Sequence, residues 1–188
     1  MLLTHLGFPV GVIKWIMCCI TNVSFSVLVN GAASPFFGSE RGLRQGFPLS
    51  PLIFLLVMED LSRLIKDMHH RDRLSGIRIM EDCTINYLLF VDDVLMFLNG
   101  GIGDLTTIQN TINLFKTATG MAINNSKSTI TIFECSPHEI NFALQRFPFT
   151  LNHSDEGLRY LGYRLKPHGY KIADWIWLIT KLEKRLHI

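Results

Sequence analysis

Two adjacent carboxylates, Asp92 and Asp93, interrupt an otherwise apolar segment, residues 87–98. The flanking aromatic, β-branched and aliphatic residues are typical of strands. No Lys, Arg or His lies between Arg78 and Lys116, so the local sequence supplies no neutralising cation. Leaving two unpaired charges beside a hydrophobic sheet costs several kcal/mol. The sequence therefore predicts either a solvated hairpin tip or a cation site, for which a hard ion such as Mg²⁺ suits carboxylate oxygens.

A basic, glycine-rich loop precedes this segment. Arg41 and Arg44 supply two guanidinium groups, Gln45 supplies an amide, and Gly42 and Gly46 permit close backbone approach. These groups suit phosphates and the edge of a base or sugar, although an ordinary basic surface loop has the same composition. A carboxylate pair and a phosphate-binding loop in one small chain together favour nucleotidyl transfer.

Composition places the 188 residues in one globular domain or in a piece of a larger one. Charged residues make up 18% and hydrophobic residues 48%, with a net charge of +2, which excludes a disordered chain or a coiled coil. The high apolar content suggests faces that something else normally covers. The four cysteines form no CxxC pair, so we expect no disulfide framework or zinc site. Without a signal peptide or membrane span, we expect an intracellular protein, nuclear or cytoplasmic, that is not secreted and does not contact a membrane.

The periodicity predicts an α+β fold with hairpins. Asn30 and Gly31 supply the positive-φ residues of a tight hairpin turn, and Ser50 followed by Pro51 predicts the N-cap and first residue of a helix. That helix is apolar all round near its start and is expected to be buried on most sides. We expect helices at residues 10–21, from 50 onward, 104–119 and from 172 onward, and strands at residues 24–29, 77–80, 84–90, 94–98, 129–133 and 160–165. Cys18 and Cys19 are expected to be core thiols.

Several motifs together resemble one family. Residues 42–54, read with Arg41, resemble the RGLRQGxPLSPxLF motif of the reverse transcriptase domain of non-LTR (LINE-type) retrotransposons, and residues 90–93 resemble its F-x-D-D motif. Further matches follow in the family's order. They are residues 24–31, residues 119–121 with 125–127, and residues 160–162. The resemblance extends from about Leu6 to the C-terminus.

The resemblance implies the palm of an RNA-directed DNA polymerase. In that family the primer 3′-hydroxyl attacks the α-phosphate of a nucleotide with the help of two metal ions, here Mg²⁺. Asp92 is then a catalytic metal ligand, and Asp93 beside it is a supporting carboxylate. The implied partners are an RNA template, a DNA primer and a deoxynucleoside triphosphate.

The resemblance also implies roles for residues outside the carboxylate pair. Arg44, Gln45, Gly46 and Lys127 would bind the nucleotide. Nucleic acid would be bound by the following residues: Leu161, Gly162, Lys181, Lys184 and Arg185. Residues 157–188 hold seven Lys or Arg against two acidic residues, a net of +5 that suits a phosphate backbone, although a solvated face explains it as well. We expect a partial palm at residues 1–168 and the beginning of a thumb helix at residues 169–188.

Part of the implied palm is missing from these residues. The family needs another aspartate on a strand upstream of Leu6, and no acidic residue precedes Glu40. The fingers also lie upstream, so we expect an incomplete sheet that lacks the first catalytic strand. Phe47 stands where the family usually has Asp, and residues 162–165 depart from its Leu-Gly-x-Pro-Leu pattern.

Three interpretations follow. The first is a reverse transcriptase-like protein derived from a LINE-type retrotransposon, truncated and inactive alone, that weakly binds Mg²⁺ if at all. The missing upstream part would then be a partner. The second is a non-catalytic nucleic-acid-binding or scaffold protein that reuses the palm. The third is a remnant with no stable product.

Overall fold

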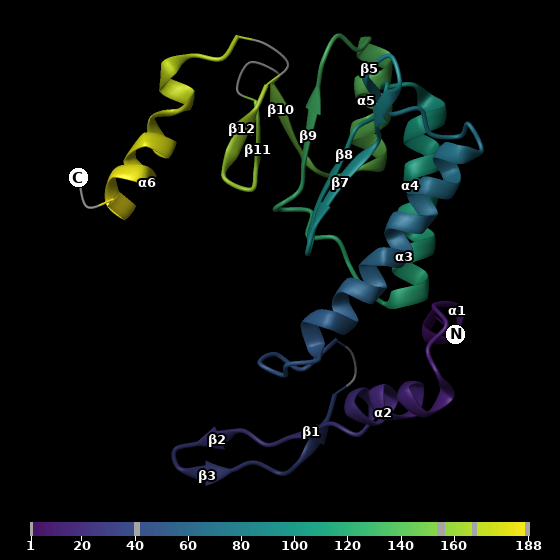
Figure 1. Ribbon diagram of the computed structural model, residues 1–188, viewed down its shortest axis with the longest axis vertical. Coiled ribbons are helices and arrows are strands. Elements are labelled where there is room, and N and C mark those ends of the chain that lie inside the picture. The colour runs from purple at the N-terminus through teal and green to yellow at the C-terminus, as the bar shows by residue number, and fades with distance from the viewer. Residues whose placement is uncertain (1, 40–41, 154–156, 167–168, 187–188) are drawn as a thin grey trace. The chain divides into compact units, whose positions relative to one another are not determined.

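The computed structural model describes residues 2–39, 42–153, 157–166 and 169–186, which form a mixed helix-and-strand structure (Figure 1). The helices are α1 (Leu2–His5), α2 (Val10–Thr21), α3 (Ser50–His70), α4 (Ile102–Thr119), α5 (Pro137–Arg146) and α6 (Ile176–Leu186), with a 3₁₀ helix, η2, at Ile172–Asp174. The strands are β1 (Ser24–Phe25), β2 (Leu28–Val29), β3 (Ala32–Ala33), β4 (Phe37–Gly38), β5 (Ile77–Met80), β6 (Cys83–Ile85), β7 (Tyr87–Phe90), β8 (Asp93–Met96), β9 (Thr129–Ile132), β10 (Thr150–His153), β11 (Leu158–Tyr160) and β12 (Tyr163–Leu165).

The chain divides into two compact units. Residues 1–97 and 110–122 form the first unit, and residues 98–109 and 123–188 form the second. The sheets are two-stranded, and every described pair is antiparallel except β9 with β10. This arrangement confirms the α+β class. No helix among the described residues combines the length and apolarity that crossing a bilayer needs.

The first hairpin of unit 1 confirms the predicted turn. Asn30 and Gly31 have φ of 52° and 83° and connect β2 to β3. The expected strand at residues 24–29 is nevertheless split in two. The Val27 N–H donates to the Ser34 hydroxyl at 3.0 Å, and Pro35, which has no N–H, follows on the return strand. Between β1–β4 and β2–β3 the Ser34 N–H still donates to the Val27 carbonyl at 2.9 Å, while the Ser34 hydroxyl takes the bond that a backbone carbonyl would accept from the Val27 N–H.

Helix α2 is less buried than its sequence suggests. Ile16 is its buried residue, whereas Trp15 is 73% exposed. Cys18 and Cys19 are both exposed, so the expectation of core thiols is wrong. An apolar composition does not bury a helix unless another element covers each face.

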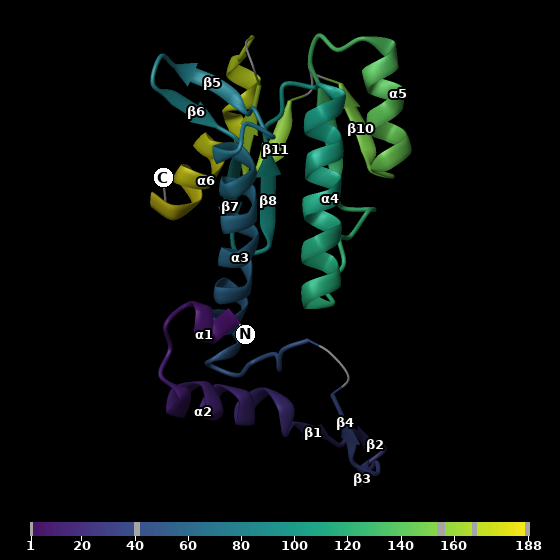
Figure 2. The ribbon, with the colours of Figure 1, turned by 90° about the vertical axis from the view of Figure 1, so that its right-hand side faces the viewer.

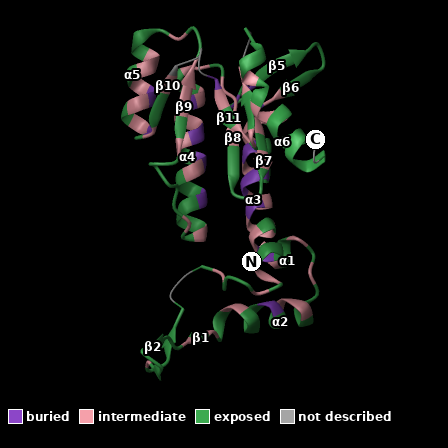
Figure 3. Cartoon of the chain, turned by 90° about the vertical axis from the view of Figure 1, so that its left-hand side faces the viewer, coloured by how far each residue is buried: buried purple, intermediate pink, exposed green. Residues whose placement is uncertain are grey.

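Helix α3 supplies most of the core of unit 1. Its buried stripe, coloured purple in Figure 3, contains Ile53, Met58, Leu61, Ser62 and Ile65. The opposite side near its start carries Leu52 and Leu55, which are 57% and 46% exposed, so the expectation of burial on most sides is wrong. Buried residues of unit 1 outside α3 include Ile16, Leu74 and Phe115.

Two hairpins follow α3. The expected strand at residues 84–90 is interrupted at Asn86, so that β6 pairs with β5 and β7 pairs with β8. Gly76 enters the first of these hairpins at φ 76°, and a Cβ there would lie 2.8 Å from the Ile85 carbonyl oxygen. The glycine therefore permits a close backbone approach at the point where the first hairpin closes.

Unit 2 contains a parallel pair that the sequence analysis missed. Strands β9 and β10 are joined through α5, which begins at a capping box: the Ser136 hydroxyl accepts from the Glu139 N–H, and the Glu139 carboxylate accepts from the Ser136 N–H. Helix α4 begins at Ile102, two residues before the expected Asp104, and Gly120 follows its end at φ 71° as predicted.

Candidate functional site

The carboxylate pair lies at the tip of hairpin β7–β8. Strand β7 ends at Phe90, which pairs with Asp93, so Val91 and Asp92 form the two-residue connection. Both carboxylates are exposed, and neither forms an ion pair with any described residue. A solvated hairpin tip is one of the two alternatives that the sequence leaves open. It leaves the two carboxylates free to bind a cation from solution.

A hydrogen bond fixes this hairpin on helix α3. The Tyr87 hydroxyl lies 2.6 Å from the hydroxyl of buried Ser62 on α3, and Figure 2 shows β7 beside that helix. The Phe97 N–H donates to the Asn86 carbonyl at 2.9 Å and extends the ladder beyond β7 and β8. The base of the hairpin is thus anchored while its tip remains in solvent.

Val91 holds a strained backbone at the tip. Its φ is 54°, a left-handed conformation that is an outlier for a β-branched residue. Left-handed backbone costs a non-glycine residue about 1–2 kcal/mol. The turn therefore carries strain directly beside Asp92, as functional turns often do.

Replacing Val91 by Asn should relieve this strain. Asn adopts left-handed backbone readily, and Val91 is 46% exposed, so little apolar burial is lost. We expect Val91→Asn to raise the free energy of unfolding by about 1 kcal/mol, measured by urea denaturation. Val94→Asn makes the same change in strand β8 without positive φ and should lower stability. Equal losses from both substitutions would contradict the strain at Val91.

The carboxylate oxygens at the tip are of the type that a hard divalent cation binds, but two carboxylates are too few to complete its coordination. Carboxylate oxygens are the ligands that Mg²⁺ prefers. Within the described part of the chain, no group of three or more His, Cys, Asp or Glu gathers where it could hold a metal ion. Asp92 and Asp93 could therefore provide part of a metal site, and further ligands would have to come from other groups.

The glycine-rich loop lies at the start of α3. The Ser50 hydroxyl donates to the Arg44 carbonyl at 2.6 Å. Leu49 occupies the N-cap, so the predicted N-cap role of Ser50 is wrong. Gly46 has φ 78° in the intervening turn. The side chains of Arg44 and Gln45 are exposed, and Arg41 lies outside the described residues.

This loop forms one wall of a pocket of about 460 Å³ in unit 1. Arg44 and Gln45 line it together with apolar residues of α2 and α3, such as Ile20 and Ile53. Neither Asp92 nor Asp93 is among its lining residues. Within unit 1 the structure thus groups the predicted nucleotide-binding residues Arg44 and Gln45, and it leaves the carboxylates at a separate tip.

Lys127 lies in unit 2, in the turn that precedes β9. Its N–H donates to the Asn124 carbonyl at 3.1 Å, and its side chain is exposed. It forms no ion pair with the described residues. Its predicted role toward a nucleotide stays a prediction.

Three of the predicted nucleic-acid-binding residues lie near one tryptophan of α6. Leu161 and Gly162, at φ 51° and 87°, form the turn of hairpin β11–β12. A Cβ on Gly162 would lie 3.8 Å from the ring of Trp177, which also meets Tyr163 edge to face at 5.4 Å. The Lys181 ammonium lies 5.8 Å from the centre of the same ring. The structure thus brings Leu161, Gly162 and Lys181 together.

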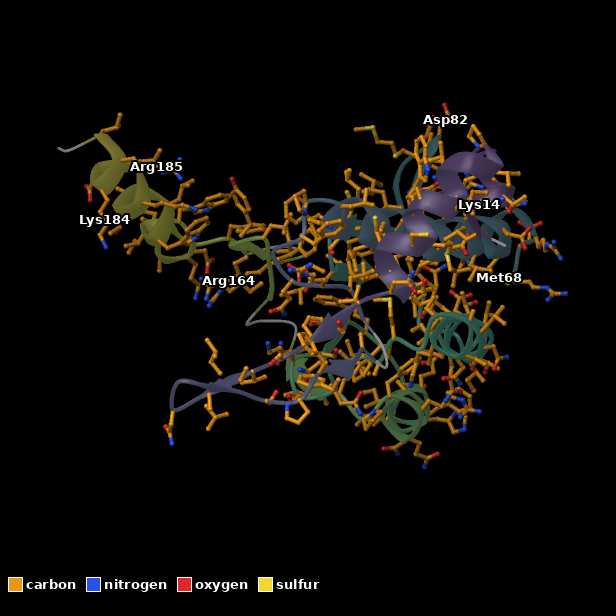
Figure 4. All side chains as sticks on the ribbon, turned by 90° about the horizontal axis from the view of Figure 1, so that it is seen from below. Lys14, Met68, Asp82, Arg164, Lys184 and Arg185 are labelled. Atoms are coloured by element: carbon orange, nitrogen blue, oxygen red, sulfur yellow. The ribbon has the colours of Figure 1, made fainter. Side chains whose placement is uncertain are left out.

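Lys184 and Arg185 lie further along α6, away from the hairpin that carries Arg164 (Figure 4). Their side chains are exposed, and neither forms an ion pair with the described residues. Together with Lys181 they give α6 a free basic surface.

Asp174 is a residue of this region that the sequence analysis did not single out as a site residue. The Lys171 N–H and the Lys166 ammonium, both donating to its carboxylate, hold the pKa of Asp174 below its usual value. The carboxylate is therefore ionised at neutral pH. In the sequence, the one signal for these contacts is the position of Asp174 among basic residues just before the last helix.

Comparison with known proteins defines the class. The family described as "Reverse transcriptase (RNA-dependent DNA polymerase)" matches residues 3–165. The chain belongs to this family, and its relatives place it among the reverse transcriptase domains of non-LTR retrotransposons.

Three curated relatives illustrate the similarity. An uncharacterized mitochondrial protein of Arabidopsis thaliana is 46% identical over 67 residues, which cover 35% of this chain and 55% of that protein. The Retrovirus-related Pol polyprotein from type-1 retrotransposable element R2 of Popillia japonica is 29% identical over 121 residues, covering 64% of this chain and 19% of the polyprotein. The polyprotein from type-2 element R2DM of Drosophila melanogaster is 28% identical over 121 residues, 64% of this chain and 11% of its own length. The chain thus spans about half of the first relative and a small part of the other two.

Proposed function

We propose that these residues form the palm portion of an RNA-directed DNA polymerase, with Asp92 as a metal ligand and Asp93 as its supporting carboxylate. The observation that carries this proposal is the anchored hairpin β7–β8, which presents two adjacent carboxylates that no described cation neutralises. Mg²⁺, when bound, would neutralise charge on the reacting phosphates. The chain's own residues would hold that cation at the hairpin tip and, through Arg44, Gln45, Gly46 and Lys127, bind the nucleotide.

The roles that we propose for the two segments of the chain follow from the resemblance. Residues 1–168 would form the partial palm, and residues 169–188 would begin the thumb. Leu161 and Gly162 would support the primer strand, while the basic residues of α6 would contact the phosphate backbone of the RNA template and DNA primer duplex.

The 188 residues alone should not polymerise. Two-metal transfer needs carboxylates from two strands, and no acidic residue precedes Glu40 to supply the other set. We expect primer extension on an RNA template with Mg²⁺ to stay at the level of the buffer blank. A chimera in which this chain replaces the matching segment of the Popillia japonica polyprotein should extend the primer, and Asp92→Asn in that chimera should abolish extension.

Asp82→Asn is the matched control for that substitution. Asp82 is also an exposed hairpin aspartate, between β5 and β6, and we assign it no role. Extension that survives Asp92→Asn, or that is lost equally with Asp82→Asn, would contradict the assignment of Asp92. Extension by the isolated chain above the blank would contradict the predicted inactivity.

A second candidate function is nucleic-acid binding without catalysis. The free basic surface of α6 favours it, because phosphate contacts need no metal ion. Salt-sensitive binding of an RNA–DNA duplex that is indifferent to Mg²⁺, together with an inactive chimera, would support this function over the polymerase.

A further inference from the structure

Asp174 ties hairpin β11–β12 to helix α6. It lies at the end of η2, directly before α6, and its side chain is 7% exposed. The Lys166 ammonium lies 3.0 Å and 2.9 Å from its two carboxylate oxygens, and Arg164 of β12 lies 3.7 Å from Oδ1. The Lys171 N–H donates to Oδ2 at 2.9 Å. One carboxylate therefore pairs with cations at the end of the hairpin and also caps the 3₁₀ helix from which α6 continues.

This arrangement sorts the basic residues of the segment into two sets. Lys166, which is 10% exposed, is held by Asp174, and Arg164, whose side chain is 52% exposed, lies 3.7 Å from the same carboxylate. Lys181, Lys184 and Arg185 on α6 are exposed and form no ion pair with described residues. The second set is available to an external polyanion, whereas Lys166 is used for internal structure.

Two other sets of described contacts hold the start of α6. The Tyr170 hydroxyl accepts from the Lys166 N–H at 2.9 Å, and the Tyr170 ring lies 5.6 Å from that of Trp175. Trp177 packs against Tyr163 and over the Gly162 turn. The remaining apolar residues of the helix are largely exposed, with Ile176 at 54% and Leu186 at 63%. Among the described residues, the orientation of the helix on the hairpin therefore depends on Trp177, on Tyr170 and on the ion pair between Asp174 and Lys166.

We propose that Asp174 is a positioning residue for nucleic-acid binding. By pairing with Lys166 and Arg164 it holds α6 so that Lys181, Lys184 and Arg185 contact one phosphate backbone together with the turn of β11–β12. This inference rests on the proposed nucleic-acid contact of α6. Asp174 itself would touch no phosphate and its own charge repels a polyanion, so its contribution to binding would come through the placement of α6.

The salt dependence of binding tests this role. We would measure the affinity of the 188-residue chain for a fluorescein-labelled RNA–DNA duplex by anisotropy, between about 50 and 200 mM NaCl. Each phosphate contact contributes about 0.9 to the slope of log K against log salt on a duplex. We expect Asp174→Asn, which is nearly isosteric and still able to accept the Lys171 N–H, to make the slope shallower by about 2–3 as the α6 contacts are lost.

Glu183→Gln is the matched control. Glu183 is the other acidic residue among residues 157–188, it is exposed on α6, and it forms no ion pair with described residues. Both substitutions remove one negative charge, which by simple electrostatics should strengthen binding. We expect Glu183→Gln to leave the slope unchanged or steeper. A slope for Asp174→Asn that is also unchanged or steeper would overturn the positioning role, while absence of salt-dependent binding by the unsubstituted chain would overturn the nucleic-acid contact itself.

A second variant keeps the test decisive if Asp174→Asn loses helical circular dichroism at 222 nm. Lys166→Gln breaks the same ion pair and leaves the Asp174 carboxylate to cap η2. It should make the slope shallower by about 2 or more, whereas Lys171→Gln, which removes an exposed cation outside the pair, should change the slope by about 0.9 or less. Equal small changes from both lysine substitutions would overturn the proposal.

Discussion

Leu74→Ala should lower the free energy of unfolding by about 3–4 kcal/mol. Leu74 is 1% exposed and, with Ile65, is one of the two largest fully buried side chains among the described residues. Removing its side chain beyond Cβ leaves a cavity and loses apolar burial in the segment between α3 and β5. Both contributions destabilise the folded state. Urea denaturation followed by circular dichroism at 222 nm measures the loss.

Leu52→Ala is the control for this substitution. It deletes the same atoms from α3 at a position that is 57% exposed, and Ala is a good helix former. We expect a change of about 0.5 kcal/mol or less. Similar losses at Leu52 and Leu74 would contradict the burial pattern of α3 and of the segment that follows it.

Gly76→Ala should be nearly as damaging, at about 2–4 kcal/mol. Its positive φ penalises any side chain, and the new Cβ would lie 2.8 Å from the Ile85 carbonyl oxygen and 3.1 Å from Asn86 Cβ. The backbone must move apart at the point where β5–β6 leads into β7. We therefore expect the thermal transition to fall and the far-ultraviolet spectrum to lose strand signal.

Gly120→Ala separates the clash from the backbone penalty. Gly120 has a similar φ of 71°, and a Cβ there would meet nothing within 4 Å. It should cost about 1–2 kcal/mol, from left-handed backbone alone. If the two substitutions destabilise the chain equally, the close approach of Gly76 to Ile85 does not exist in solution.

The site illustrates which features local sequence can predict. The hairpin tip at Asp92 follows from two carboxylates between apolar segments, and the turn at Asn30 follows from the positive φ that its residue type accepts. Both are decided within a few residues. Helix α5 was missed although Ser136, Pro137 and Glu139 form a capping-box pattern, a local signal that was present in the sequence.

Other features depend on partners that lie apart in the chain. Ser at position 50, directly before Pro51, is typical of an N-cap. The Ser50 hydroxyl instead donates to the Arg44 carbonyl, because the loop turns back at Gly46. In the sequence, Asp174 looks like an ordinary acidic residue at the start of a helix. The low exposure of its side chain follows from the ion pair with Lys166, eight residues earlier. Residue type alone does not specify such pairings.

The sequence by itself determined the α+β class, the exposed carboxylate hairpin and the membership of the reverse transcriptase family, because alternation, turn chemistry and motif order are properties of neighbouring residues. Only the tertiary structure decided which apolar faces are covered. Cys18, Cys19 and Leu52 are exposed although their neighbours are apolar, whereas the Asp174 side chain is only 7% exposed although its neighbours include charges. Burial depends on what packs across from a residue, and that is fixed by contacts between segments far apart in the chain.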